Sequence, residues 1–422
     1  MRRTINKKID EIIQFAGENQ NRISYYTVAD ILKDREEQID EKQLQEAMNL
    51  LNSRGIAVVQ DGEDDESYPA EDAADSFIPA DVNISQRNVN IYNLMERLEN
   101  DEIELNPEFQ RHKNLWNEET QSRLIESLML KIPIPAFYFN AADESRWIVI
   151  DGLQRLTAFQ NFLVGDRESG EKKKFVGLQY LRDFNGRTFD ELPRQYVRRI
   201  KETSVIAFAV ERGTPDAVVF NIFKRINTGG LQLNEQEIRQ ALYHGKSTKL
   251  VECLAESEEF LEATQHAISP ARMNDREYVT RFLAFTEIDY RKDYKGNIDN
   301  YLIKAMKQIN QYDESRLEEI DANFRQVMVR CSTLFGRLAF RKYRKNGRRG
   351  PINKALFEMW SVCLIELSQK EFQRVMEQKS ALIERFGQLL EENEFLTELK
   401  AGDQYSTIRR IERVRQLLKE FI

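Results

Sequence analysis

The sequence predicts an α+β protein, with a mixed αβ core between a small N-terminal helical domain and a mostly helical C-terminal region. A short apolar run with β-branched residues at 147–150 predicts a buried strand, and it leads directly into a helical pattern. From residue 272 onward, helical periodicity continues with few glycines or prolines. A chain of 422 residues is long enough for two to three domains.

The charge distribution divides the chain. The net charge is −8, and residues 1–80 alone hold 9 basic and 18 acidic side chains, so the rest is nearly neutral. An acidic protein is a poor general binder of phosphate-bearing partners, but this objection applies only to the N-terminal segment. We predict a small helical domain over 1–60, an acidic linker over 61–84, the mixed core domain over 85–270 and a helical domain with a basic loop over 271–422.

The 1–60 segment contains three amphipathic helical patterns followed by a short strand at 56–59. This order resembles the acidic N-terminal region of bacterial primary sigma factors, and residues 23–32, 39–40 and 54–59 carry the resemblance. It implies an acidic domain that mimics nucleic acid or blocks access to it. The alternative is an ordinary protein-docking bundle.

Cysteine, histidine and hydropathy patterns exclude several classes of protein. The three cysteines and three histidines are too few and too scattered for a disulfide framework or a zinc site, so we predict no metal site of that kind. No stretch approaches the ~20 apolar residues of a membrane span, and the N-terminus turns polar before a signal peptide could form. We expect a cytoplasmic protein without a membrane partner.

The strand at 147–150 is followed by the most informative local pattern. Asp151-Gly152 ends the strand in a tight turn, and Gln154 and Arg155 stand at the opening of the next helix. A helix N-terminus offers N–H groups and a positive dipole end, which suit a phosphate, and an arginine adds a two-pronged donor. The alternative is a structural turn in which Arg155 pairs with a nearby carboxylate.

A later block supports the same site. The apolar pattern at 220–226 predicts a helix that stops at Asn227-Thr228-Gly229-Gly230. Asn234 then caps a second helix, with Glu237 as the partner of its capping box. Glu237 therefore has a structural explanation, whereas Arg225 and Asn227 have none and are better candidates for a site.

Four blocks, at 106–116, 121–135, 147–157 and 220–243, occur in this order. Together they resemble the GmrSD-type restriction endonuclease N-terminal domain family, whose fold is similar to ParB and sulfiredoxin. The resemblance covers roughly residues 85–290. It implies a nucleotide-binding, ParB-like protein of a bacterial restriction or anti-phage defence system that acts on foreign DNA, with a partner protein from the same system.

The family's loop, usually written DGQQR, binds a nucleoside triphosphate and in several members hydrolyses it. It falls on Asp151–Arg155 here, where Leu153 replaces the commoner Gln. The resemblance implies GTP or ATP as the nucleotide, with Mg²⁺ as a further cofactor if hydrolysis occurs, and catalytic roles for Asp151 and Gln154. The nucleotide-binding residues that it implies are Gln110, Arg111, Asp151, Gly152, Gln154, Arg155, Arg225, Asn227 and Thr228.

Many proteins of this family carry a second half with an HNH nuclease, whose metal site needs histidines. No histidine of this chain lies beyond His266, so we expect that half to be absent. The last third instead predicts helices around 315–342, 354–368, 370–391 and 404–421.

A basic loop interrupts this helical region. Residues 331–354 hold eight basic side chains and no acidic one. Such a loop is typical of a nucleic-acid footprint, and the alternative is a solvated loop that docks the acidic N-terminal segment. The candidate nucleic-acid-binding residues are Arg341, Lys342, Arg344, Lys345, Arg348 and Arg349.

Three functions follow. The first is nucleotide binding with or without hydrolysis, the second is DNA binding or cleavage that needs no nucleotide, and the third is a non-enzymatic regulator that its acidic segment inhibits.

Overall fold

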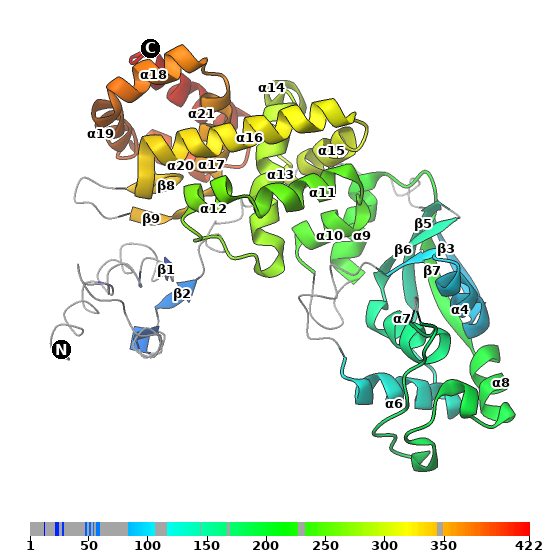
Figure 1. Ribbon diagram of the computed structural model, residues 1–422. Helices are drawn as coiled ribbons and strands as arrows, with labels where there is room; N and C mark the ends of the chain where they lie inside the picture. Colours follow the sequence, from blue (N-terminus) through cyan, green and yellow to red (C-terminus); the bar gives the residue numbers. More distant parts are fainter. Residues whose placement is uncertain are drawn as a thin grey trace. The chain divides into compact units, whose positions relative to one another are not determined.

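The chain forms two compact units, which we describe separately (Figure 1). The sheet unit comprises Asp75–Leu242, and the helical unit comprises Tyr243–Ile422 together with Met1–Ala74. The computed structural model describes residues 12, 22–24, 28, 47–48, 50–51, 54, 56–59, 83–105, 116–143, 145–166, 169–226, 233–343 and 349–422.

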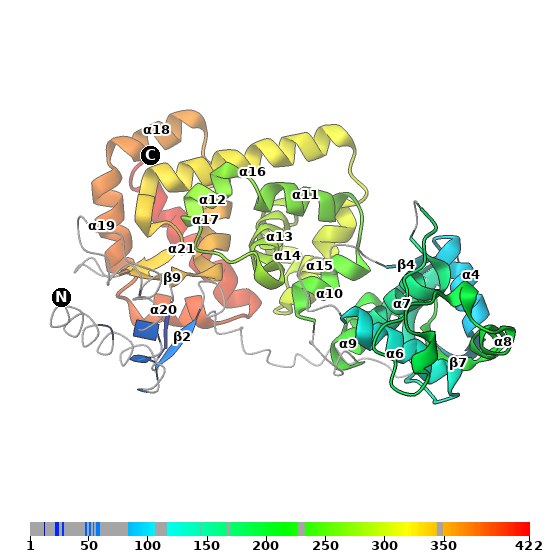
Figure 2. The same ribbon diagram turned by 60° about the horizontal axis from the view of Figure 1, so that its bottom comes forward.

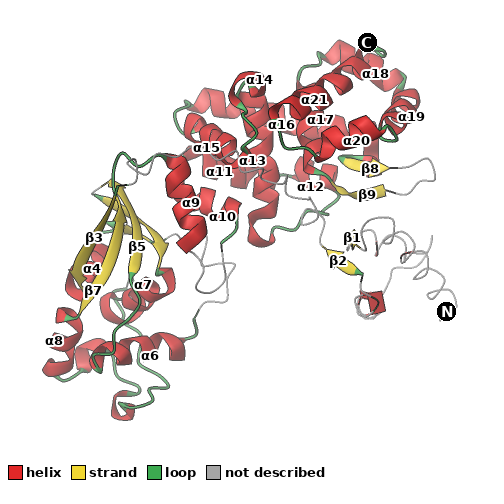
Figure 3. Cartoon of the chain, turned by 180° about the vertical axis from the view of Figure 1, so that it is seen from behind, coloured by secondary structure: helices red, strands yellow, loops and turns green. Residues whose placement is uncertain are grey.

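The sheet unit contains a five-stranded mixed sheet with the strand order β3-β7-β5-β6-β4 (Figure 3). β5 pairs in parallel with β7 and antiparallel with β6, so the sheet combines both kinds of ladder. Short parallel pairing adds β4 at one edge, and antiparallel pairing adds β3 at the other. The strands are β3 (Ile84–Asn90), β4 (Ile103–Glu104), β5 (Phe137–Asp143), β6 (Arg146–Asp151) and β7 (Ser204–Val210).

Helices cover this sheet because their apolar residues recur on one face. In α4 the buried residues Ile91, Leu94, Met95 and Leu98 follow helical spacing. α4 and α6 both contact α8, and α6 also contacts α7. The helices of the unit are α4 (Ile91–Glu99), α6 (Glu118–Met129), α7 (Leu153–Phe159) with a π-helical turn (Gln160–Val164), α8 (Arg194–Glu202), α9 (Asp216–Ile226) and α10 (Glu235–Leu242).

In the helical unit, α17 packs against α13, α16, α20 and α21 (Figure 2). Ten residues of α17 are buried, as expected of a helix surrounded on all sides by protein. Its helices are α11 (Lys246–Ala255), α12 (Glu258–Thr264), α13 (Asn274–Glu287), α14 (Tyr290–Asp293), α15 (Ile298–Ile309), α16 (Glu314–Phe335), α17 (Lys354–Ile365), α18 (Gln369–Glu377), α19 (Lys379–Leu389), α20 (Asn393–Lys400) and α21 (Gln404–Lys419). Its strands form two pairs, parallel β1 (Arg22–Ser24) with β2 (Ala57–Val59) and antiparallel β8 (Arg341–Tyr343) with β9 (Arg349–Ile352).

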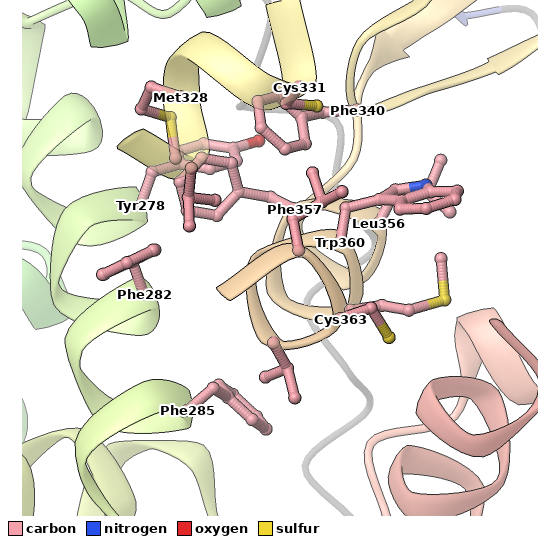
Figure 4. Packing of buried hydrophobic residues seen from close by; sticks show 14 of the residues in the cluster. Tyr278, Phe282, Phe285, Met328, Cys331, Phe340, Leu356, Phe357, Trp360 and Cys363 are labelled. Atoms are coloured by element: carbon pink, nitrogen blue, oxygen red, sulfur yellow. The ribbon is translucent and has the colours of Figure 1, made fainter. Parts of the chain in front are cut away.

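Aromatic packing and one buried carboxylate hold the centre of this unit. Figure 4 shows side chains of α13, α16 and α17 meeting there, and the rings of Tyr278 and Phe357 lie 5.2 Å apart edge to face. Glu358 of α17 has no exposed surface and accepts hydrogen bonds from Arg281 of α13 (2.5 Å) and Arg410 of α21 (2.8 Å). Three helices therefore converge on one negative charge.

The structure confirms the predicted α+β class and the mostly helical C-terminal region. The predicted helix at 315–342 is wrong at its end, because α16 stops at Phe335 and β8 begins at Arg341. Gly336 and Phe340 both have positive φ, at 52° and 59°, and such backbone cannot continue a helix. None of the described helices combines the length and apolar character that a membrane crossing requires.

The compact sheet unit ends at Leu242, whereas the sequence placed the end of the core domain at residue 270. The difference arises because α11 and α12 bury apolar side chains, such as Val251 and Phe260, in the core of the helical unit. The predicted strand at 56–59 is present as β2 and pairs with β1. Most of the predicted 1–60 domain and nearly all of the 61–84 linker lie outside the described residues.

Candidate functional site

The predicted strand, turn and helix around Asp151 are all present. β6 ends at Asp151, Gly152 takes the positive φ of 104°, and α7 begins at Leu153. A Cβ atom at Gly152 would lie 2.9 Å from Cε1 of Phe137 and still closer to Cδ1 of that ring. Phe137 is fully buried, so only glycine fits at this turn.

The N-terminus of α7 has no capping side chain among the described residues. The N–H groups of a first helical turn have no acceptor inside the helix. The first intrahelical bond runs from the Leu156 N–H to the Gly152 carbonyl, over 2.9 Å. A π-helical turn at Gln160–Val164 extends the helix beyond α7. Aligned N–H groups and the helix dipole favour an anion here.

Arg155 points into the protein. It is 7% exposed, and its Nη2 donates to Oδ2 of Asp151 over 2.7 Å. Its Nη1 donates to the carbonyls of Pro135 and Ala136, and its guanidinium lies 4.4 Å from the centre of the Phe137 ring. Of the two alternatives that the sequence left open for Arg155, the ion pair with a carboxylate is the one present. Burial lowers the pKa of Arg155, and Asp151 partly offsets that shift.

Asp151 and Gln154 lie at the mouth of the turn. The Asp151 side chain remains 29% exposed beside its ion pair. Oε1 of Gln154 accepts from the Trp116 N–H over 3.2 Å, and the Trp116 carbonyl accepts from Nε2 of Gln121 over 2.7 Å. The described chain therefore resumes at Trp116 beside this turn, and the predicted residues Gln110 and Arg111 lie outside the described part.

The described part of the last predicted block contains α9 and α10. The capping box of α10 is confirmed, since the Asn234 N–H donates to Glu237 and the Glu237 N–H donates to Asn234, each over 2.8 Å. Lys224 of α9 pairs with Glu235 of α10 over 2.7 Å, which joins the two helices. Arg225 is exposed near the end of α9, and α9 contacts β6. The predicted residues Asn227 and Thr228 lie outside the described part.

Metal-ligand side chains do not gather in the described part of the chain. No group of three or more His, Cys, Asp or Glu side chains is close enough there to hold a metal ion. At the turn, Oδ2 of Asp151 binds Arg155, and the partly exposed carboxylate offers its other oxygen as a ligand for a cation. Mg²⁺ commonly takes one or two carboxylates together with substrate phosphates, so this donor set fits a metal that arrives with a nucleotide.

The basic loop is a hairpin whose arginines partly face inward. Arg341 is 1% exposed and donates to the Gly350 carbonyl over 3.0 Å. Arg349 is also buried, and its Nη1 donates to the Arg337 carbonyl over 2.6 Å and to Gln265 over 2.8 Å. The third described residue of the candidate set, Lys342, is partly exposed, and Arg344, Lys345 and Arg348 lie outside the described part.

Sequence reasoning missed two features of the sheet unit. Glu126 is almost fully buried and binds a distant loop, and nothing in its local helical pattern indicates this. The segment 172–201 holds nine basic and three acidic side chains. A count of charged residues over 172–201 would have found this basic segment, whereas a count over all residues after 80 gives a nearly neutral sum.

These features define an α+β domain with a glycine turn between an interior strand of the sheet and a helix. Residues 91–244 match the family model described as the GmrSD restriction endonuclease, N-terminal domain. The matched part of the chain lies almost wholly in the sheet unit, and it is similar to the N-terminal domain of that restriction endonuclease family. The comparisons with curated proteins and with solved structures found no match.

Proposed function

We propose that this is a restriction-type protein that acts on DNA and that its sheet unit binds a nucleoside triphosphate at the Asp151–Arg155 turn. The observation that carries the proposal is the uncapped N-terminus of α7, which directly follows the left-handed Gly152 at the end of a central strand. A glycine turn of this kind lets a phosphate approach the backbone, and the helix N–H groups bind its oxygens.

Arg155 has a positioning role in this proposal. Its donors are engaged by Asp151 and by the carbonyls of Pro135 and Ala136, so it holds the turn rather than the phosphate. The N–H groups of Leu153 and Gln154 would bind phosphate oxygens, since they open the helix. Positive charge for the remaining phosphates would come from Arg111 and Arg225.

Hydrolysis would depend on Asp151 and Gln154. A water or Mg²⁺ would be oriented by the partly exposed carboxylate of Asp151 and by the amide of Gln154, which is held at the turn by Trp116. Gln110, Asn227 and Thr228, which lie outside the described residues, would complete the pocket.

The decisive experiment is a binding and hydrolysis assay with all four nucleoside triphosphates, with and without duplex DNA. We compare the wild-type protein with Asp151→Asn, because an amide can still accept from Arg155 but removes the negative charge. Asp143→Asn is the matched control, since Asp143 pairs with Arg146 at the opposite end of the β5–β6 hairpin.

We expect Asp151→Asn to lower hydrolysis by at least about 100-fold, a loss typical of a missing acid–base or metal-orienting group. Asp143→Asn should leave hydrolysis unchanged. Absence of binding for every nucleotide in the wild-type protein would reject the nucleotide site, and equal hydrolysis by both variants would reject the role of Asp151.

A further inference from the structure

The segment 172–201 of the sheet unit has a local excess of positive charge, with nine basic and three acidic side chains. Three of its nine basic residues form ion pairs, namely Lys172 with Asp190, Lys173 with Glu118 and Arg198 with Glu202. Glu191 forms a capping box with Thr188, whose hydrogen bonds lower the pKa of Glu191, and the positive charges of Lys174 and Arg187 help to lower it. The other six basic residues form no ion pair within the described ranges, and they are Lys174, Arg182, Arg187, Arg194, Arg199 and Lys201.

This segment is fixed in place although much of it is irregular. The buried carboxylate of Glu126 accepts three backbone N–H groups, from Gln179 over 3.0 Å and from Tyr180 and Leu181 over 2.8 Å each. Ser122 of the same helix accepts from the Val176 N–H over 3.1 Å. These hydrogen bonds attach the backbone of the loop to α6, so the positions of its exposed side chains are fixed.

Two aromatic rings on this surface lie next to each other, with an arginine against each of them. The guanidinium of Arg187 lies 5.6 Å from the Phe184 ring, Phe184 lies 5.1 Å from Tyr196, and Tyr196 lies 5.4 Å from the guanidinium of Arg199. We call these four residues the aromatic–cationic row. Stacking against rings restricts the arginines, which lowers the entropy that they lose on binding a partner.

Two further groups extend the row. The Phe175 N–H donates to the Arg187 carbonyl over 2.8 Å, which brings Lys174 next to the row. The Tyr180 side chain is 73% exposed even though Glu126 binds its backbone. A large ring held in water on a rigid loop is typical of a surface that meets a partner.

We propose that the 172–201 segment is the face with which the sheet unit contacts duplex DNA. Lys174, Arg187 and Arg194 would bind backbone phosphates, and Tyr180 would contact the sugar or a base edge. Six cations that form no ion pair in the described structure match a polyanion, and DNA is the polyanion because the proposal rests on the restriction-type function above. It does not depend on nucleotide binding at Asp151.

The test is salt-dependent binding of a fluorescein-labelled duplex by the full chain. The variant carries Lys174→Gln, Arg187→Gln and Arg194→Gln, which are exposed and have no ion pair in the described structure. The matched control carries Lys370→Gln, Arg374→Gln and Lys419→Gln, which are exposed residues of the helical unit and change the net charge equally. Thermal unfolding of both variants checks that they fold.

We expect the 174/187/194 variant to bind at least tenfold more weakly and its salt slope to fall by about 3, which is about one for each phosphate contact. The control should bind as the wild type does. If the wild type binds DNA and both variants bind equally, the assignment of this face is overturned while the proposed function stands. If the wild type binds no DNA, both the assignment of this face and the proposed function fail. If polyglutamate competes for binding as strongly as unlabelled DNA does, the assignment of this face to DNA is overturned.

Discussion

The turn at Gly152 allows a sharp test of the site geometry. Replacement by alanine forces a non-glycine residue to adopt a φ of 104°, which costs about 1–2 kcal/mol. The new Cβ would also overlap Phe137, a fully buried ring, and overpacking of this kind costs about 1–3 kcal/mol. We therefore expect Gly152→Ala to lower the free energy of unfolding of the sheet unit by about 2–5 kcal/mol.

Gly186→Ala separates the two contributions. Gly186 also has a positive φ, of 81°, but no atom lies within 4 Å of the position that its Cβ would take. Gly186→Ala should therefore lower the free energy of unfolding by only about 1–2 kcal/mol, which is the cost of the positive φ alone. Differential scanning calorimetry of the full chain measures both variants, with an expected loss of about 4–20 °C in the midpoint for Gly152→Ala. A loss no larger than that of Gly186→Ala would refute the predicted contact with Phe137.

Three further predictions follow from buried groups. Glu126→Gln should speed hydrogen exchange of the backbone N–H groups at 179–181, because an amide replaces the carboxylate that accepts all three of them. The lost hydrogen bonds are worth about 1–3 kcal/mol. Unchanged exchange would contradict this role of Glu126. Glu358→Gln should destabilise the helical unit in urea by about 3–5 kcal/mol, because two buried arginines lose their shared negative charge, whereas a neutral result would mean that water reaches them. Burial raises the pKa of the thiols of Cys331 and Cys363, so little thiolate exists at pH 8, and mass spectrometry should find iodoacetamide on exposed Cys253 alone until the protein is denatured.

Local signals in the sequence were sufficient where the interaction is local. The strand before Asp151, the glycine turn and the helix after it depend on neighbouring residues, and the structure contains all three. The Asn234–Glu237 capping box spans three residues and was predicted for the same reason. Turn chemistry and capping can be read from a sequence because their partners are adjacent.

Contacts between residues that lie far apart in the sequence could not be predicted in this way. The donors of Arg155 reach carbonyls about twenty residues earlier, and only the folded chain shows that the β5 entry lies beside α7. Arg341 and Arg349 appeared to belong to an exposed basic loop, yet strand pairing turns both toward the protein. A charge-reversal test of that loop should therefore keep Arg349, since its loss would disturb folding as well as any contact with DNA.

The convergence of three helices on Glu358 also constrains how the protein is made. Glu358 emerges from the ribosome after Arg281 but about 50 residues before Arg410, and synthesis of those residues takes roughly 3–10 s at about 5–20 residues per second. During that interval Glu358 can pair with only one of its two arginines, so its charge would be incompletely neutralised in a closed core. The helical unit should therefore stay open on the ribosome and close late, and in that interval its apolar helices depend on chaperones or on rapid completion of the chain.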